Sequence, residues 1–216
     1  MDGTGATHSE SAIRVMAGGH REEGLHSATR ELLERKIGQT LDLIARRSQG
    51  TPRLIVSLAE GADRLIMAGA LAREWPVTAV LPFARDEFAC DFESTASQQE
   101  YLGMLHRAER VIALPGVRGA TAGDGAAYAA ANQVMLDQAD LVLSVWDGKP
   151  ARGPGGTAEV VAQAQARGLP VIWIASQPPH KLRLLDPEEE NLAHPWWRQL
   201  AADLTQPAAH SSAESG

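Results

Sequence analysis

The chain has 216 residues, a net charge of −7 and one cysteine, and these values exclude several classes of protein. A chain of this length forms one globular domain whose core needs neither disulfide nor structural metal, and Cys90 has no second cysteine to pair with. The acidic balance disfavours binding to bulk nucleic acid. No secretory signal begins the chain, and no apolar run reaches the ~20 residues of a membrane span. We therefore expect a cytoplasmic protein that makes no membrane contact.

Six β-rich runs recur along the chain. Several, such as LIVSL, LVLSVW and VIWIA, are almost continuously apolar rather than alternating. Strands of this kind are buried on both faces, as in a parallel sheet covered by helices. The expected strands are Ala12–Ala17, Arg53–Leu58, Val77–Phe83, Arg110–Leu114, Leu141–Trp146 and Val171–Ala175.

Helical patterns separate these runs. Between Ser27 and Arg47, leucines and isoleucines recur at three- and four-residue steps and predict one apolar stripe. Four further segments are rich in alanine and also favour helix: Ala62–Arg73, Ala96–Arg107, Ala126–Ala139 and Thr157–Ala166. Alternating strands and helices predict a three-layer α/β/α sandwich around a mostly parallel, Rossmann-like sheet.

The two ends of the chain differ from its centre. Residues 1–11 and 205–216 are rich in Ser, Ala and Gly and are expected to be disordered tails around a single domain spanning 12–204. Residues 177–191 are rich in proline and charge, and Pro195 then opens a short amphipathic helix to Leu204. Its residues Trp196 and Trp197 pack on the domain's own core, the interpretation we favour, cap the sheet, or form a subunit contact.

Ligands of open parallel sheets collect at the carboxyl ends of the strands, where loops meet helix N-termini. The richest loop follows Trp146 and runs from Asp147 to Glu159, with Lys149 at its start and Gly155, Gly156 and Thr157 at the beginning of the next helix. Free N–H groups there would bind an anion. The same pattern also fits a tight turn with an ordinary helix cap.

Three other loops reach the same edge. Gly18, Gly19, His20 and Arg21 follow the first strand; Glu60, Gly61 and Asp63 follow the second; Pro82 and Arg85 follow the third. A glycine pair followed by two side chains that can contact an anion suits a phosphate. Taken alone, Asp63 suits a partner of the helix dipole and His20 a structural histidine.

Common cofactor motifs are absent. The first strand is not followed by GxGxxG, and no Walker lysine with Ser or Thr is present, which argues against a nicotinamide cofactor and a P-loop ATPase. The histidines, His106 among them, lack zinc-ligand spacing. Cys90 has no sequence partner and is interpreted as a buried or neutral thiol. We expect no metal and no cofactor.

The ordered set GGHR, SLAEGADRL, AVLPF, LVLSVWDGKPARGPGGTAEVV and PVIWI resembles the SLOG superfamily over about Ile13–Ile174. This superfamily contains DprA-type and LOG-type proteins with a Rossmann-like fold. The resemblance implies either a domain that senses a nucleotide-derived ligand or a LOG-like phosphoribohydrolase, which cleaves the N-glycosidic bond of nucleoside 5′-monophosphates.

The chain departs from the LOG enzymes at two places. Their motif PGGxGTxxE is shortened here to Pro154–Glu159, and Ala131 and Asn132 lie where those enzymes carry Arg-Lys. N-glycosidic cleavage needs a carboxylate beside a positively charged ribosyl transition state, so the catalytic candidates would be Glu159 and Asp147.

We therefore interpret the chain first as a binding module for a nucleotide or nucleotide-derived phosphosugar. The alternatives are a LOG-like hydrolase and, third, a scaffold that keeps the fold without a ligand. The resemblance also implies a homo-oligomer, at least a dimer, formed through helices beside the sheet.

Overall fold

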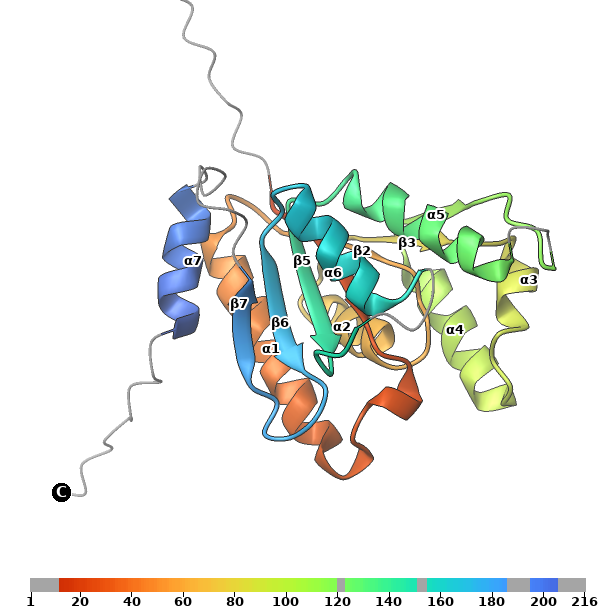
Figure 1. Ribbon diagram of the computed structural model, residues 1–216, viewed down its shortest axis with the longest axis horizontal. Helices are drawn as coiled ribbons and strands as arrows, with labels where there is room; N and C mark the ends of the chain where they lie inside the picture. Colours follow the sequence, from red (N-terminus) through yellow and green to blue (C-terminus); the bar gives the residue numbers. More distant parts are fainter. Residues whose placement is uncertain (1–11, 120–122, 151–154, 186–194, 206–216) are drawn as a thin grey trace, which may run out of the picture.

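The computed structural model describes residues 12–119, 123–150, 155–185 and 195–205, and in them strands and helices alternate along the chain (Figure 1). The strands are β1 (Arg14–Gly19), β2 (Arg53–Val56), β3 (Val77–Leu81), β4 (Arg110–Ala113), β5 (Leu141–Trp146), β6 (Val171–Ala175) and β7 (Leu182–Leu185). The helices are α1 (Arg30–Arg47), α2 (Ala62–Leu71), α3 (Arg85–Ala89), α4 (Thr95–Arg107), α5 (Asp124–Leu136), α6 (Thr157–Ala166) and α7 (Pro195–Thr205).

All the strands join one seven-stranded sheet of order β4-β3-β2-β1-β5-β6-β7. The first six strands along the chain pair in parallel, and β7 pairs antiparallel with β6. From β1 the chain builds outward through β2 to β4 on one side, and then returns to add β5 to β7 on the other. The order therefore reverses between β1 and β5, as in other doubly wound sheets.

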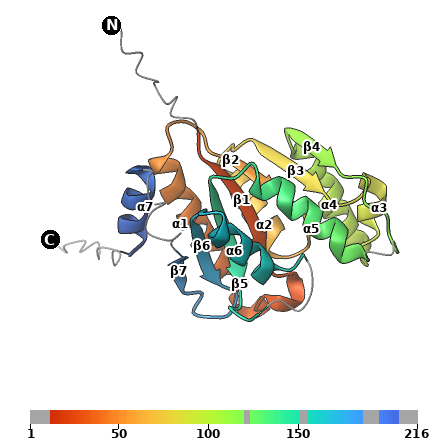
Figure 2. The same ribbon diagram turned by 45° about the horizontal axis from the view of Figure 1, so that its top comes forward.

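Helices cover both faces of the sheet. Along β1, Val15 and Ala17 pack against α1 and α2, whereas Met16 between them packs against α5 and α6. Helices α4 and α7 also bury side chains on the first face. Figures 1 and 2 show α5 and α6 together on one side of the sheet, with α1 and α2 on the other. The predicted three-layer sandwich is confirmed.

The apolar stripe predicted for the first helix is present in α1. Leu33, Ile37, Leu41 and Ile44 are all buried, while most of the remaining helix surface is polar or charged. Within the described ranges, no helix combines the length and the apolar character that crossing a bilayer requires. Burial of this one stripe against the sheet and α2 fixes the helix in its layer.

The observed elements agree with the predicted ones except at two places. The bounds of β5, β6 and α6 are as predicted, and the other elements shift by a few residues. Strand β7 lies inside the segment read only as rich in proline and charge, and α3 was not predicted. Each has at most five residues, too few to show a period in the sequence.

Helix α7 packs beside α1 in both views of the ribbon (Figures 1 and 2). Trp197 is buried in the core, and Arg47 of α1 binds Asp203 of α7 with an N–O distance of 2.7 Å. The interpretation that Trp197 packs on its own domain therefore holds, whereas the side chain of Trp196 lies outside the described residues. The helix continues to Thr205, one residue into the predicted tail.

Candidate functional site

A cavity of about 590 Å³ opens at the carboxyl end of the sheet, where the strand order reverses. Its wall contains the end of β1, the loops after β2, β3 and β5, the first turn of α6 and one face of α5. The predicted site residues that line it are Gly18, Gly19, His20, Arg21, Asp63, Pro82, Asp147, Lys149, Gly155, Gly156 and Thr157. Four loops from separate parts of the sequence thus meet at one cavity.

The first turn of α6 presents backbone N–H groups to this cavity. The earliest hydrogen bonds within the helix are donated by the N–H groups of Glu159 and Val160 to the carbonyl of Gly156. The N–H groups of Gly156, Thr157 and Ala158 precede these bonds, and all three residues line the cavity. Such a turn attracts anions because its N–H groups and the helix dipole carry partial positive charge.

Helix α5 holds the turn that precedes α6. The side-chain amide of Asn132 donates to the carbonyl of Gly155 at 3.1 Å, and Asn132 and Ala131 both line the cavity. These are the positions where the resemblance to LOG enzymes would place Arg-Lys. Here Asn132 holds the glycine turn through its hydrogen bond, and neither residue carries a positive charge.

His20, Asp147 and Lys149 form a polar cluster between the ends of β1 and β5. His20 Nε2 lies 3.0 Å from Asp147 Oδ1 and 3.1 Å from the backbone nitrogen of Asp147. The neutral ring accepts the N–H bond, and the protonated ring donates to the carboxylate. Lys149 Nζ is 3.2 Å from Asp147 Oδ2, and its side chain is otherwise exposed at the cavity rim.

This cluster keeps Asp147 ionised. Burial alone would raise the pKa of its carboxyl, but hydrogen bonds from the Lys149 backbone N–H and from the His20 and Lys149 side chains outweigh burial and lower the pKa to about 2. Asp147 is therefore a permanent negative charge in the cavity wall at neutral pH.

The pKa of Asp63, at the start of α2, is shifted in the opposite direction. Its side chain is only 4% exposed, and Ser57 Oγ donates to Asp63 Oδ2 at 2.6 Å. Burial raises the pKa of the carboxyl to about 6, although the bonds from Ser57 and the Ala59 backbone and the charge of Arg21 lower it. A buried, titratable carboxyl in a cavity wall is a typical feature of functional sites.

Arg21 brings a guanidinium to the cavity. Its Nη2 lies 3.4 Å from Asp91 Oδ2 and 3.5 Å from the Tyr128 hydroxyl oxygen. Tyr128 and Arg118 make shorter hydrogen bonds to the same buried carboxylate of Asp91. Arg118 therefore neutralises Asp91, and Arg21 makes the longer contact with the same carboxylate.

Two of the predicted glycines are required by the packing of the loops. A Cβ at Gly19 would lie 2.4 Å from Ala62 Cβ, and a Cβ at Gly61 would lie 2.6 Å from the carbonyl oxygen of His20. Gly61 also has a φ of +92°. Both positions thus require glycine because the loops after β1 and β2 cross at contact distance.

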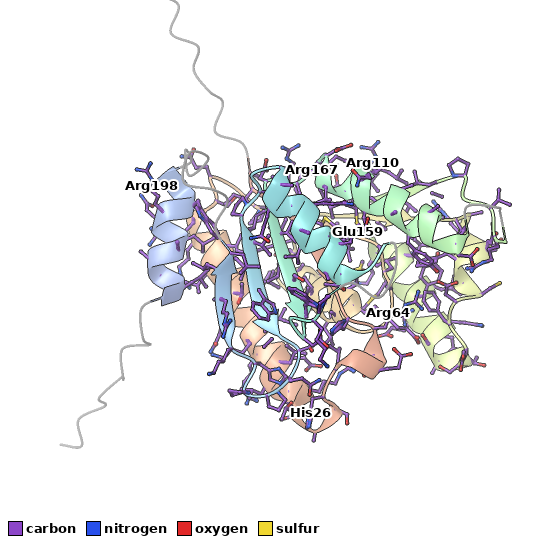
Figure 3. All side chains as sticks on the ribbon, viewed as in Figure 1. His26, Arg64, Arg110, Glu159, Arg167 and Arg198 are labelled. Atoms are coloured by element: carbon purple, nitrogen blue, oxygen red, sulfur yellow. The ribbon has the colours of Figure 1, made fainter. Side chains whose placement is uncertain are left out.

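Four predicted site residues do not line this cavity. Glu60 and Gly61 line a second cavity of about 420 Å³ beside Arg64 and α4, where Ser97 donates to Glu60. Arg85 is exposed at the start of α3. Glu159 lies near the N-terminal end of α6 in Figure 3, where it accepts bonds from the Gly155 N–H at 2.6 Å and the Gln163 amide at 2.9 Å.

Other cavity residues were not predicted. Tyr128 and Met135 come from the face of α5 that meets the cavity, Ser57 and Trp146 from the strand ends, and Gln177 from the segment after β6. Of these, only Trp146 carried a signal, since it ends a buried strand beside the richest loop. Arg152, Gly153 and Pro154 of that loop lie outside the described residues.

Cys90 is not part of the cavity wall. Cys90 is exposed at the end of α3, so the interpretation of a buried thiol is wrong; its Sγ lies 3.5 Å from the Asp86 carbonyl. The short helix leaves the cysteine on its outer side while Phe88 enters the core. Across the described part of the chain, no three His, Cys, Asp or Glu side chains gather as metal ligands would.

Fold and cavity together define a doubly wound α/β protein with a cavity at its topological switch point. Among solved structures, the chain is similar to DNA processing protein A (DprA) from Streptococcus pneumoniae, with 17% identity and a TM-score of 0.51. The match covers 78% of this chain and 52% of that one, so the chain spans about half the length of this relative. The match confirms the Rossmann-like fold that the resemblance predicted.

A structural genomics target, TM1055, matches with 17% identity and a TM-score of 0.46, covering 74% of this chain and 72% of that one. The sequence itself matches no protein-family profile and no curated protein.

Proposed function

We propose that this chain binds a nucleotide or nucleotide-derived phosphosugar in the cavity at the β1/β5 switch point. The observation that carries the proposal is the first turn of α6, because Gly156, Thr157 and Ala158 line a cavity that His20, Arg21 and Lys149 also line. A phosphate placed there meets backbone donors, a helix dipole and side-chain cations together.

The rest of the cavity suits the sugar and the base. Its volume of about 590 Å³ lies within the range of small-ligand sites. Asp63 and Asp147 offer carboxylate acceptors for sugar hydroxyls, and Met135, Val160 and Trp146 offer apolar surface. The net charge of −7 supports a small ligand rather than a nucleic-acid polymer.

Binding is better supported than N-glycosidic cleavage. Both carboxylate oxygens of Glu159 are hydrogen-bonded at the start of α6, and this residue is not part of the cavity wall. Ala131 and Asn132 bring no cation to the site. Of the two catalytic candidates, only Asp147 lines the cavity, and its carboxylate is already paired with Lys149 and His20.

Replacing Gly156 tests the phosphate site. Its backbone (φ −79°, ψ 162°) is one that valine adopts readily, so Gly156→Val should fold while its side chain covers the N–H groups. We expect nucleotide affinity to fall by on the order of 100-fold, the worth of about two charge-assisted hydrogen bonds.

The measurement is calorimetry with the four nucleoside 5′-monophosphates, after mass spectrometry of small molecules released from the purified protein. Gly103→Val is the matched control, because a Cβ at Gly103 meets nothing within 4 Å and the residue lies on α4, away from the cavity. Unchanged affinity in Gly156→Val would show that the phosphate does not bind at this turn.

We also propose a homo-oligomer, at least a dimer. Because Trp197 packs inside its own domain, it offers no surface to a partner. The exposed large apolar side chains of the described residues are Leu102 on α4 and Val117 after β4, near the β4 edge of the sheet. Light scattering at micromolar concentration checks this proposal, and a particle of 23.1 kDa would contradict it.

A further inference from the structure

Trp146 is the large aromatic side chain that ends β5 at the cavity. It lines the cavity and is partly buried, on the same sheet face as α6. The loop of glycines and charged residues that follows it does not explain why an indole should lie there. Its surroundings show how it is held.

Trp146 is supported from behind by Trp173 of β6. The two ring centroids lie 5.5 Å apart, and the Trp173 Nε1–H donates to the carbonyl of Trp146 at 2.8 Å. Arg183 of β7 places its guanidinium 5.1 Å from the centre of the Trp173 ring. Trp173 is not part of the cavity wall, so Trp146 is the member of this stack that reaches the ligand space.

The loop after β5 packs against the same pair of tryptophans, Trp146 and Trp173. Gly148 has a φ of +82°, and a Cβ built on it would lie 3.1 Å from the Trp173 ring. The backbone that carries Asp147 and Lys149 therefore rests directly against the support of Trp146. An indole fixed in this way presents a rigid aromatic surface, which loses little conformational freedom when a planar group stacks on it.

We infer that Trp146 is the stacking surface for the base of the ligand, which makes the ligand class an intact nucleotide rather than a base-free phosphosugar. This inference rests on the proposed function, because the phosphate would bind at the first turn of α6 in the same cavity. Stacking tolerates any base, since every base has a π-face, and it therefore leaves the choice of base to other residues.

Calorimetry compares wild type and Trp146→Ala against AMP, GMP, CMP, UMP and ribose 5-phosphate. Loss of the stack should weaken nucleotide affinity by about 10- to 100-fold, the range expected for one base on one aromatic ring. Affinity for ribose 5-phosphate should change by less than about twofold, because that probe has no base to stack. Equal weakening of both probes, or of neither, would overturn the inference while leaving the proposed function in place.

Tryptophan fluorescence provides a second readout in variants that keep an aromatic ring. Saturating nucleotide should quench the wild type, and ribose 5-phosphate should not. Trp75→Phe is the matched control, since Trp75 is buried just before β3, at the opposite edge of the sheet, and should keep the quenching. Trp146→Phe should lose most of it while still binding nucleotide.

The outcomes separate the two claims. If the wild type binds ribose 5-phosphate but no nucleoside monophosphate, the stacking inference fails and phosphosugar binding survives. If it binds none of the five probes, both fail. Thermal melting of each variant identifies any loss of affinity that comes from unfolding, and the fluorescence of Trp146→Phe then decides the question.

Discussion

The loop after β2 and the loop after β5 each bring one aspartate to the same cavity, and the two carboxylates meet opposite surroundings. Asp63 is buried beside a serine hydroxyl and backbone N–H groups, and its pKa rises, chiefly because of burial, to about 6. Asp147 is only partly buried, a lysine, a histidine and a backbone N–H reach it, and its pKa falls to about 2.

This difference follows from burial and partners together, because Asp63 is the more deeply buried carboxyl and Asp147 is the one that a lysine and a histidine reach. Two sites at the carboxyl ends of parallel strands would look equivalent in the sequence. In the structure, Asp147 stabilises the loop that carries Lys149, whereas the charge of Asp63 costs stability at neutral pH. A group that costs stability and faces a cavity suits contact with a ligand.

The largest expected effect comes from Asp63→Asn, which imitates the protonated carboxyl. Because the pKa of Asp63 is about 6 in the folded protein and 3.8 in the unfolded chain, the folded state binds more protons between these values. Stability is therefore greatest below the unfolded value and is lost as the pH rises through the folded one. At pH 8 the variant should gain about 2–3 kcal/mol in free energy of unfolding, and at pH 4 only about 0.5 kcal/mol.

Urea denaturation at the two pH values measures this gain. Asp137→Asn is the control, because the Asp137 carboxylate is exposed in a surface ion pair with Arg167 and its removal should leave stability nearly unchanged at both pH values. A gain for Asp63→Asn that is equal at pH 4 and pH 8 would mean that the carboxyl does not titrate as its burial implies.

Asp147→Asn should change stability in the opposite direction. The folded pKa of about 2 lies below the usual 3.8, so the ionised carboxylate stabilises the protein above the unfolded value, and this stabilisation is lost as the pH falls through the folded one. We expect a loss of about 2 kcal/mol at pH 7 that shrinks to roughly half at pH 3. Guanidinium denaturation at both pH values checks it; a loss that does not depend on pH would assign the effect to packing alone.

The sequence predicted the sheet better than it predicted the cavity. Strands β5 and β6 are continuous apolar runs that end at Asp147 and Ser176, so their bounds were visible. Strand β7 escaped because it is a four-residue edge strand of only half-buried leucines around an exposed arginine. Its pairing depends on β6, which local sequence does not reveal.

Within the site, the sequence located the loops but not which side of each loop meets the cavity. Glu60 and Asp63 are three residues apart, yet they line different cavities because the chain turns at Gly61 to start α2. Tyr128 and Asn132 reach the cavity only because α5 turns that face toward α6. Such orientations follow from tertiary packing, which the hydrophobic periodicity of one sequence does not reveal.

The smallest expected effect is that of Glu159→Gln, and it separates binding from hydrolysis. The Glu159 carboxylate accepts the Gly155 N–H and the Gln163 amide at the start of α6. Gln keeps an oxygen that can accept one of these bonds, so the variant should lose only about 0.5 kcal/mol of stability, chiefly the interaction of the charge with the helix dipole.

Incubation with AMP, followed by chromatographic measurement of free adenine, tests the catalytic role directly. We expect no release of adenine above background by the wild type and no change of nucleotide affinity in Glu159→Gln. A carboxylate that stabilised a ribosyl cation would act only in the transition state, so its loss would lower the rate on the order of 10²–10³-fold while leaving binding intact. Turnover by the wild type that disappears in Glu159→Gln would therefore favour the hydrolase function over binding alone. It would also require Glu159 to leave its two present hydrogen bonds and enter the cavity beside Asp147.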